Sequence, residues 1–271
     1  VNTFTDNTGN SNFAFYRGGL DYLIDNRNTL SIYGNIMKGE FDNSSNQIID
    51  SILSGISSPS VGLDNSSKFS FLNKGGQVSF KHLFAEAGHE LSADFNYNER
   101  NNDNNSLIKS TFINQRTIGS GYNKNYTSNI DYERIFKNNA KFEAGVRLNS
   151  RYEFNARDQY RDEILVNSIS NQLKYSEQIL AAYSNMGGKK DNLSYQLGFR
   201  VENRDYTVNV LNKQGQDSLE SKIKLPISLF PSAFISYKLN EKTDVQFKYS
   251  KRINAPNPFQ LQPFADYSDP L

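Results

Sequence analysis

Apolar and polar side chains alternate with a period of two residues along several stretches of the chain. From His89 to Asn98 the odd positions are His, Leu, Ala, Phe and Tyr, whereas the even positions are Glu, Ser, Asp, Asn and Asn. The same alternation runs through residues 141–154, 193–202 and 245–250. A period of two places one row of side chains on each face of a β-strand. These stretches therefore predict four strands, each with one apolar and one polar face.

Short polar turns join each of these strands, and one more, to a partner run. The turns are rich in Asn, Gly, Asp and Lys, as tight hairpins require, and fall at residues 25–28, 85–88, 137–140, 187–192 and 240–243. The partner runs before them are residues 15–24, 77–84, 126–136, 175–186 and 229–239. The pattern predicts five hairpins and about ten strands. Much longer polar connections are expected between the hairpins, at residues 40–76, 99–122, 155–174 and 203–228.

Short turns at one end and long connections at the other favour an outer-membrane barrel over a soluble sandwich, whose connections lie at both ends. No apolar run approaches the roughly 20 residues that a membrane helix requires. Aromatic side chains gather at both ends of the strands, as in the girdles of such barrels. We expect one girdle beside the short turns, from Phe84, Phe136, Phe142, Tyr183, Tyr195 and Tyr237. The other is expected beside the connections, from Tyr97, Tyr126, Tyr152, Phe154 and Tyr249.

If the apolar rows face lipid, the polar rows must line a lumen. We expect Leu91, Phe95, Val146, Leu148, Leu197, Phe199 and Phe247 to face outward. The site residues expected to face the lumen or a plug are Asp94, Glu143, Arg147, Arg151, Arg200, Glu202, Lys248 and Arg252, with Asp131 and Glu133 on the same rows. A dry core cannot hold so many charges, so the wall is expected to surround water or a folded plug. The predicted fold is all-β: an antiparallel transmembrane meander forming about ten strands of a barrel of roughly 22.

The charge balance and the absence of cysteine exclude several function classes. Lys and Arg number 30 against 29 Asp and Glu, a net charge of +1, which gives no electrostatic reason to expect a nucleic-acid partner. Without Cys, the chain has no disulfide framework and no thiolate site. It starts at Val1 without a charged and then apolar leader, so it is expected to be a mature form or, as we favour, a fragment.

Catalytic and metal-binding sites are not expected. His82 and His89 fall on the predicted lipid face, where interfacial packing is the simpler interpretation, and Ser79 and Ser92 fall on the opposite face from His82. The acidic pair at residues 162–163 lies in a predicted loop without an apolar pocket. No cofactor is predicted.

Two loop-like motifs and three prolines are expected to have structural roles and not binding roles. The Asn-rich run at residues 101–105 lacks the ligand spacing of calcium loops and is expected to be a solvated loop. The Gly-Ser-Gly at residues 119–121 is expected to be a flexible loop end without the strand and helix context of a phosphate site. Pro256, Pro258 and Pro263 are expected to fix an extended loop after the last strand.

Several segments resemble TonB-dependent receptor barrels of the outer-membrane β-barrel family. They are YSKRINAP at 249–256, QLQPF at 260–264, DP at 269–270, LFPS at 229–232, SYKL at 236–239, GFRVE at 198–202 and RGGLDY at 17–22. Two positions depart from that pattern: Ala255 stands where relatives usually carry Arg, and Gln262 stands in place of Asn. The resemblance covers nearly the whole chain.

The resemblance implies a ligand-gated active transporter in which a plug fills the barrel and TonB pulls on the plug from the periplasm. The whole chain, residues 1–271, is then expected to be a partial barrel domain in the cell outer membrane, in contact with lipid, without plug or TonB-binding segment. The imported ligand would be a siderophore, vitamin, glycan or peptide. Two alternatives stay open at this point: a plugless porin-like or adhesive barrel, and a soluble β protein that binds partners through its loops.

Overall fold

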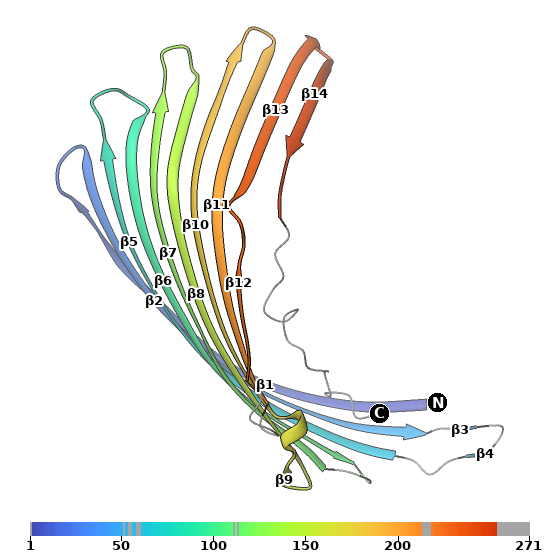
Figure 1. Cartoon of the computed structure of the whole chain (residues 1–271). Coiled ribbons are helices and arrows are strands. Elements are labelled where there is room, and N and C mark those ends of the chain that lie inside the picture. Colours follow the sequence, from blue (N-terminus) through green and yellow to red (C-terminus); the bar gives the residue numbers. More distant parts are fainter. Residues whose placement is uncertain are drawn as a thin grey trace.

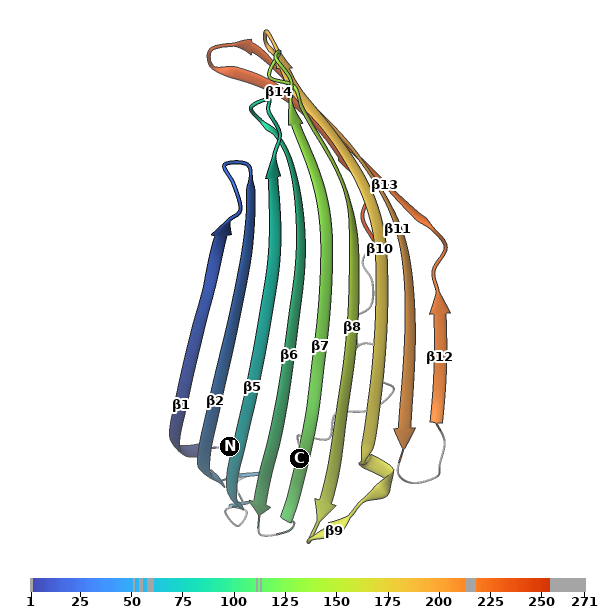
Figure 2. The same ribbon diagram turned by 90° about the vertical axis from the view of Figure 1, so that its left-hand side faces the viewer.

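The chain forms one long, open, antiparallel sheet. The computed structural model describes residues 2–50, 52–53, 56–57, 61–110, 112, 114–212 and 218–253. The strands of the main path follow the order β1 (Asn2–Leu23), β2 (Asn28–Asp50), β5 (Val61–Leu83), β6 (His89–Ser110), β7 (Asn114–Ile135), β8 (Lys141–Arg161), β10 (Asn171–Lys190), β11 (Leu193–Asn212), β13 (Ser228–Asn240) and β14 (Thr243–Ser250). Figures 1 and 2 show this wall from its edge and from its convex side. The predicted ten-strand meander is confirmed.

Four short strands and one turn of 3₁₀-helix complete the described part. β12 (Ser218–Lys224) pairs with β11, and β9 (Ile164–Leu165) pairs with β8. β3 (Ile52–Leu53) and β4 (Ile56–Ser57) form a separate pair, and η1 (Asn167–Ile169) precedes β10. None of the described residues lies in a helix long and apolar enough to cross a membrane. Within the described residues β1 and β14 each pair on one side only, so the sheet is an open wall, as predicted.

The predicted long connections are wrong in extent, because most of their residues continue the strands. β2 runs on to Asp50 and β6 to Ser110, whereas loops were expected from residues 40 and 99. β8 and β11 likewise extend to Arg161 and Asn212. In these outer halves the period-two pattern fades while the backbone ladder continues, since a strand that has both faces wetted needs no apolar row. The Asn-rich run at 101–105 and the Gly-Ser-Gly at 119–121 therefore lie in paired strands.

The short turns agree with the prediction except at one place. Residues 187–190 belong to β10, so that turn shrinks to Asp191 and Asn192, with Asp191 at φ 53°. In the first turn the Asp25 carboxylate accepts hydrogen bonds from the backbone N–H groups of Arg27 (2.7 Å) and Asn28 (2.8 Å). These bonds, the Arg27 one above all, lower the pKa of Asp25. Gly88 has φ +70°, and a Cβ there would lie 2.8 Å from Ile135, so the second turn requires glycine.

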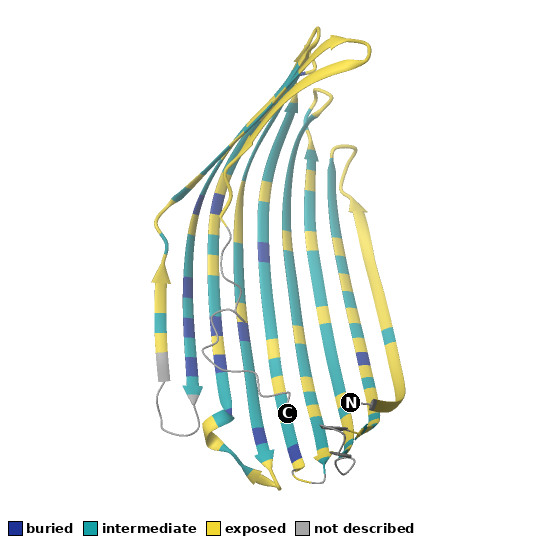
Figure 3. Cartoon of the chain, turned by 90° about the vertical axis from the view of Figure 1, so that its right-hand side faces the viewer, coloured by how far each residue is buried: buried dark blue, intermediate teal, exposed yellow. Residues whose placement is uncertain are grey.

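A break in the strand beside β11 separates two levels of the wall. β11 pairs with β13 through Leu193–Glu202 and with β12 through Asp205–Leu211. Residues 225–227 bulge out between them, and the N–H of Leu225 donates to the carbonyl oxygen of Arg204 (3.0 Å). Leu225 packs against a small core on β10 and β11 made of Leu173, Tyr175, Tyr206, Val208 and Val210. This core lies toward the end away from the short turns, where buried segments are seen in Figure 3.

The convex face carries an uncharged band with an aromatic cluster at its border beside the short turns. On β7 the charged residues of this face are Arg134 and Lys124, with only Tyr, Ile and Ser at positions 132, 130, 128 and 126 between them. Ten residues of strand tilted near 40° rise about 26 Å, the height of a bilayer core. At the border beside the short turns the ring of Phe84 stacks on His89 (centroids 3.9 Å apart), and Tyr132 packs edge-on against His89 (5.2 Å). Both histidines thus lie on the predicted lipid face beside the short turn, and their interfacial role stays a prediction.

Candidate functional site

The concave face carries the predicted charged rows, and strand register brings several of their members into line. Asp94 of β6 lies opposite Asn129, which lies opposite Arg147 of β8. Arg147 lies opposite Ala181 of β10, which lies opposite Glu202 of β11. Five side chains thus form one row across five strands. Since next neighbours in a sheet are about 4.8 Å apart, Arg147 and Glu202 are about 10 Å apart across Ala181.

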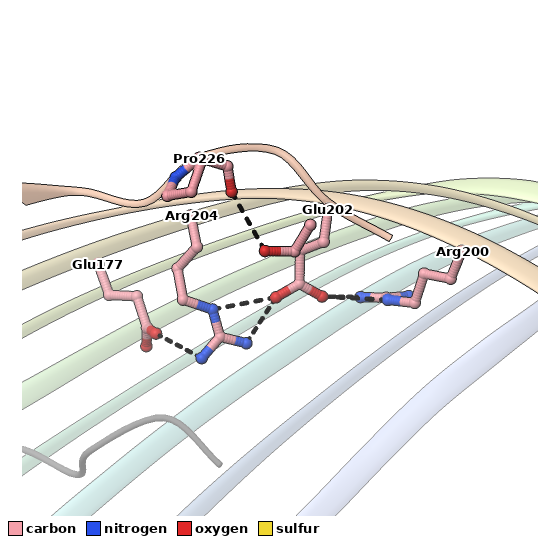
Figure 4. A network of polar contacts seen from close by, with 6 residues as sticks. Glu177, Arg200, Glu202, Arg204 and Pro226 are labelled. Carbon is pink, nitrogen blue, oxygen red and sulfur yellow. Dashed lines mark hydrogen bonds and ion pairs between the residues drawn. The ribbon is translucent and has the colours of Figure 1, made fainter. Parts of the chain in front are cut away.

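A network of charges on β10 and β11 is centred on Glu202 (Figure 4). Arg200 donates from Nε (3.1 Å) and Nη2 (2.9 Å) to one carboxylate oxygen of Glu202. Arg204 donates from Nε (3.0 Å) and Nη2 (2.7 Å) to the other oxygen. Arg204 also pairs through Nη1 with Glu177 (3.5 Å). Glu202 is buried at 6% exposure, so both lone-pair sets of its carboxylate are used within the wall.

A second carboxylate on β8 gathers polar groups in the same way. Glu153, also buried, accepts from Arg151 Nη2 (2.7 Å), from Asn155 Nδ2 (2.8 Å) and from Asn123 Nδ2 (3.4 Å). Arg151 lies opposite Glu177 in the register of β8 and β10. The two networks therefore adjoin, and they form a continuous belt of charge across β8, β10 and β11.

Other members of the predicted set are left without a partner in the described part of the chain. Arg147, Asp94 and Arg252 make no hydrogen bond or ion pair with any described residue, and Lys248 contacts only the face of the Phe234 ring (5.3 Å). Arg147, Arg252 and Arg200 line one hollow of about 620 Å³. Glu143, in contrast, is paired with Lys141 (2.6 Å), which also bridges to Glu133 (3.0 Å). Among the described residues, the wall thus carries a few charged side chains without a polar partner beside many that are paired.

Tyr183 does not belong to an aromatic girdle, contrary to the prediction. Its hydroxyl donates to the carboxylate of Asp131 on the concave face, across the backbone of Gly145. A Cβ at Gly145 would lie 2.4 Å from Asp131 Oδ1 and 2.7 Å from the Tyr183 hydroxyl. Glycine at this position therefore leaves the space in which the ring crosses one strand to reach its partner.

Sequence reasoning missed Arg204, Glu177 and Glu153. Arg204 continues the even-numbered row of β11 beyond Glu202, but residues from 203 onward were assigned to a loop. Glu177 lies on β10, whose alternation is broken by Ser176 and Gln178. Extending the period of residues 193–202 by two would have found Arg204, and Glu153 stands on the polar row of residues 141–154, whereas no periodic signal marks Glu177. Pro256, Pro258 and Pro263 lie outside the described residues.

The residues weighed for catalysis and metal binding make structural contacts in the described part of the chain. In the described part of the chain there is no group of three His, Asp or Glu side chains that could hold a metal ion. His82 bonds through Nδ1 to the Asn28 side chain (2.7 Å), whereas Ser79 accepts from Gln77 on the other face. Asp162 and Glu163 form a tight turn with positive φ, in which Glu163 lies 3.7 Å from Arg116. These contacts position backbone and surface, and none pairs a nucleophile with a base.

Single cysteines at positions 147 and 148 are expected to react in opposite ways with a water-soluble thiol reagent. Residues 1–271 contain no Cys, so each introduced thiol is the only one within this section of the protein. Arg147→Cys faces the concave side and should be labelled in intact outer membranes, whereas Leu148→Cys faces lipid and should be protected until detergent is added. Mass spectrometry of the labelled full-length protein measures both. Labelling at 148 with protection at 147 would contradict the facing of every strand.

Comparisons with known proteins agree with this architecture. The model of the outer membrane protein beta-barrel family matches residues 82–271. No curated protein matches the chain. Among solved structures, the ferric yersiniabactin uptake receptor FyuA from Yersinia pestis is 8% identical with a TM-score of 0.51, over 87% of this chain and 44% of that one.

Two further solved receptors are similar at lower scores. The alcaligin outer membrane receptor FauA from Bordetella pertussis is 13% identical with a TM-score of 0.43, over 88% of this chain and 41% of that chain. The ferric-catecholate import receptor Fiu from E. coli K12 is 9% identical with a TM-score of 0.46, over 90% of this chain and 49% of that chain. The chain spans less than half of the length of each of these receptors.

Proposed function

The chain belongs to the outer membrane protein beta-barrel family and lies in the outer membrane, and from that premise we propose that it is a section of the barrel wall of a TonB-dependent receptor. In this proposal residues 1–271 are part of a longer protein with a plug domain and further strands. The receptor imports a siderophore, vitamin, glycan or peptide with energy delivered through TonB. The likeness to FyuA supports the fold of such a wall.

The observation that carries the proposal is the open, charged, concave wall. The ten strands form one curved sheet that does not close into a barrel within the described residues. In this proposal the complete barrel therefore has more strands. Small barrels fill their interior with side chains, whereas barrels of about 22 strands enclose a plug. Buried carboxylates that each bind two or three donors make a rigid polar surface, against which a folded polar domain can dock.

The free charges of the wall are the groups proposed to contact the plug. Asp94, Arg147 and Arg252 have unused hydrogen-bonding capacity, whereas Glu202 and Glu143 are already paired. Arg151, Arg200 and Lys248 each make a contact within the wall, but each guanidinium or ammonium group still has N–H donors that this contact does not use. In this proposal, the lumen-facing charged side chains that have no partner within the wall find one in the plug. No catalytic group is proposed.

Conductance of the purified full-length protein in a planar lipid bilayer tests this proposal without knowledge of the ligand. A plugged barrel is expected to stay closed at moderate voltage and to open when urea unfolds the plug. A steady open channel before urea would contradict the plug and favour the porin-like alternative. Once a ligand is identified, uptake of that ligand in cells lacking TonB would contradict the energised mechanism.

A further inference from the structure

A hollow on the outer half of the concave wall has the features of a ligand site. Its floor includes the backbone of β7 at Gly119, which carries no side chain. β6 borders it on one side with Arg100, Asn102 and Asn104, and β8 on the other with Asn155 and Arg157, all on the same face. The hollow has a volume of about 890 Å³, enough for a small oligosaccharide.

Gly119 keeps this floor open, whereas the neighbouring Gly121 is covered by side-chain amides. A Cβ at Gly121 would lie 2.5 Å from Asn155 Oδ1 and 3.3 Å from Asn102 Oδ1, so the two amides close in over the backbone from both sides. A Cβ at Gly119 would meet only ordinary contact, 3.6 Å from the Cβ of Asn104. Any longer side chain at position 119 would therefore project into the hollow itself.

Arg100 is held in place by aromatic rings but keeps its donors free. Its guanidinium carbon lies 4.9 Å from the centroid of Phe71 and 6.0 Å from that of Phe69, and these rings pack with Phe41 into a three-ring cluster. Stacking fixes the plane of a guanidinium and leaves its N–H edge for a planar oxyanion. Arg100 has no hydrogen bond or ion pair with any described residue. It is an oriented cation without an anion.

The amides around Arg100 determine the rest of the ligand chemistry. Asn102, Asn104 and Asn171 line the hollow, and their side-chain amides donate or accept no hydrogen bond among the described residues. A side-chain amide both donates and accepts, which suits hydroxyl groups. Peptide binding by strand addition needs a free sheet edge, and β6, β7 and β8 are paired on both sides here.

We propose that this hollow, at the mouth of the barrel, binds an acidic oligosaccharide, with a sugar carboxylate on Arg100 and sugar hydroxyls on the asparagine amides. The inference rests on the proposed receptor function and narrows its ligand to one class. It gives a role to the Asn-rich run at 101–105 and to the Gly-Ser-Gly at 119–121, two segments whose polar composition predicts loops.

Calorimetric titration of the full-length protein in detergent tests the site. The acidic probes are trigalacturonate and a hyaluronan tetrasaccharide, and the comparison probes are maltotriose, which lacks a carboxylate, and triglutamate, which lacks the sugar hydroxyls. We expect the acidic sugars to bind at least tenfold more tightly than either comparison probe. Arg100→Gln should weaken acidic-sugar binding about tenfold or more, as loss of a charge-assisted hydrogen bond does.

Matched variants separate this site from general charge effects and from misfolding. Arg17→Gln removes another arginine of the concave face that stacks on a tyrosine (Tyr33, 5.5 Å), and should leave binding unchanged. Gly119→Leu should abolish binding by filling the hollow, whereas Gly119→Ala should keep most of it. No binding of either acidic sugar, equal binding of maltotriose or triglutamate, or full binding by the Arg100 variant would overturn the inference. A barrel that stays closed in the bilayer measurement while these titrations fail leaves the receptor function standing.

Discussion

Phe199→Arg is expected to impair assembly in the outer membrane severely, whereas Arg200→Leu at the next position leaves it nearly intact. The convex row of β11 is uncharged from Leu193 to Asn203, and Phe199 lies near its middle. A charge at the lipid midplane of a barrel costs about 2–4 kcal/mol, whereas a lumen substitution avoids that cost. Glu202 keeps its bonds to Arg204 in the Arg200 variant.

Heat-modifiable gel mobility of the full-length protein in outer-membrane fractions measures both variants. The folded fraction of the Phe199 variant should fall well below that of the wild type, with the Arg200 variant close to it. Phe247→Arg, on β14 and on the same face of the sheet as Phe199, provides a second lipid-facing comparison. Equal assembly defects for Phe199→Arg and Arg200→Leu would mean that the two side chains do not lie on opposite faces of a membrane wall.

Glu202→Ala is expected to destabilise the folded barrel by about 3 kcal/mol. Removing one partner of a buried ion pair typically costs about 3–5 kcal/mol, since the remaining charge stays desolvated. Here two guanidinium groups lose their acceptor, but Arg204 keeps Glu177, which favours the lower end of that range. Urea unfolding of the full-length protein in detergent, followed by gel mobility, gives the change in free energy of unfolding.

Glu40→Ala is the matched control for this measurement. Glu40 pairs with Lys38 two residues away on its own strand, at 2.7 Å, as Glu202 pairs with Arg200 and Arg204. Both side chains are well exposed, at 49% and 62%, and exposed pairs contribute little. If Glu40→Ala and Glu202→Ala shift the urea midpoint equally, burial does not distinguish the two pairs and the Glu202 network does not stabilise the wall.

The sequence predicted the strands that cross the bilayer far better than the strands beyond it. Where one face meets lipid, apolar side chains must recur at every second position, as from Leu193 to Val201. Beyond that level both faces of β6 meet water, and residues such as Asn102 and Asn104 carry no periodic signal although their backbone is fully paired. Polar composition therefore led to the prediction of loops where the strands continue, by about ten residues at the outer end of most strands.

The candidate site was predicted in its rows but not in its pairings. Alternation placed Arg200 and Glu202 on one face, and the structure confirms that they bond. Register across strands is a long-range property, so the partnership of Arg204 with Glu177 could not be read from either strand alone. Tyr183 shows the same limit, since its inward direction depends on Asp131 and on the space above Gly145, two strands and one strand away.

The paired outer halves of the strands would change the entropy of the ligand capture proposed above. A loop of 20 residues that must order around a ligand loses about 1–2 kcal/mol of backbone entropy for each residue fixed. In β5 through β8 that ordering is completed on folding, because the ladders reach Ser110 and Arg161. Capture at this mouth then resembles docking to a rigid surface, and its association rate should depend on diffusion and charge rather than on loop closure.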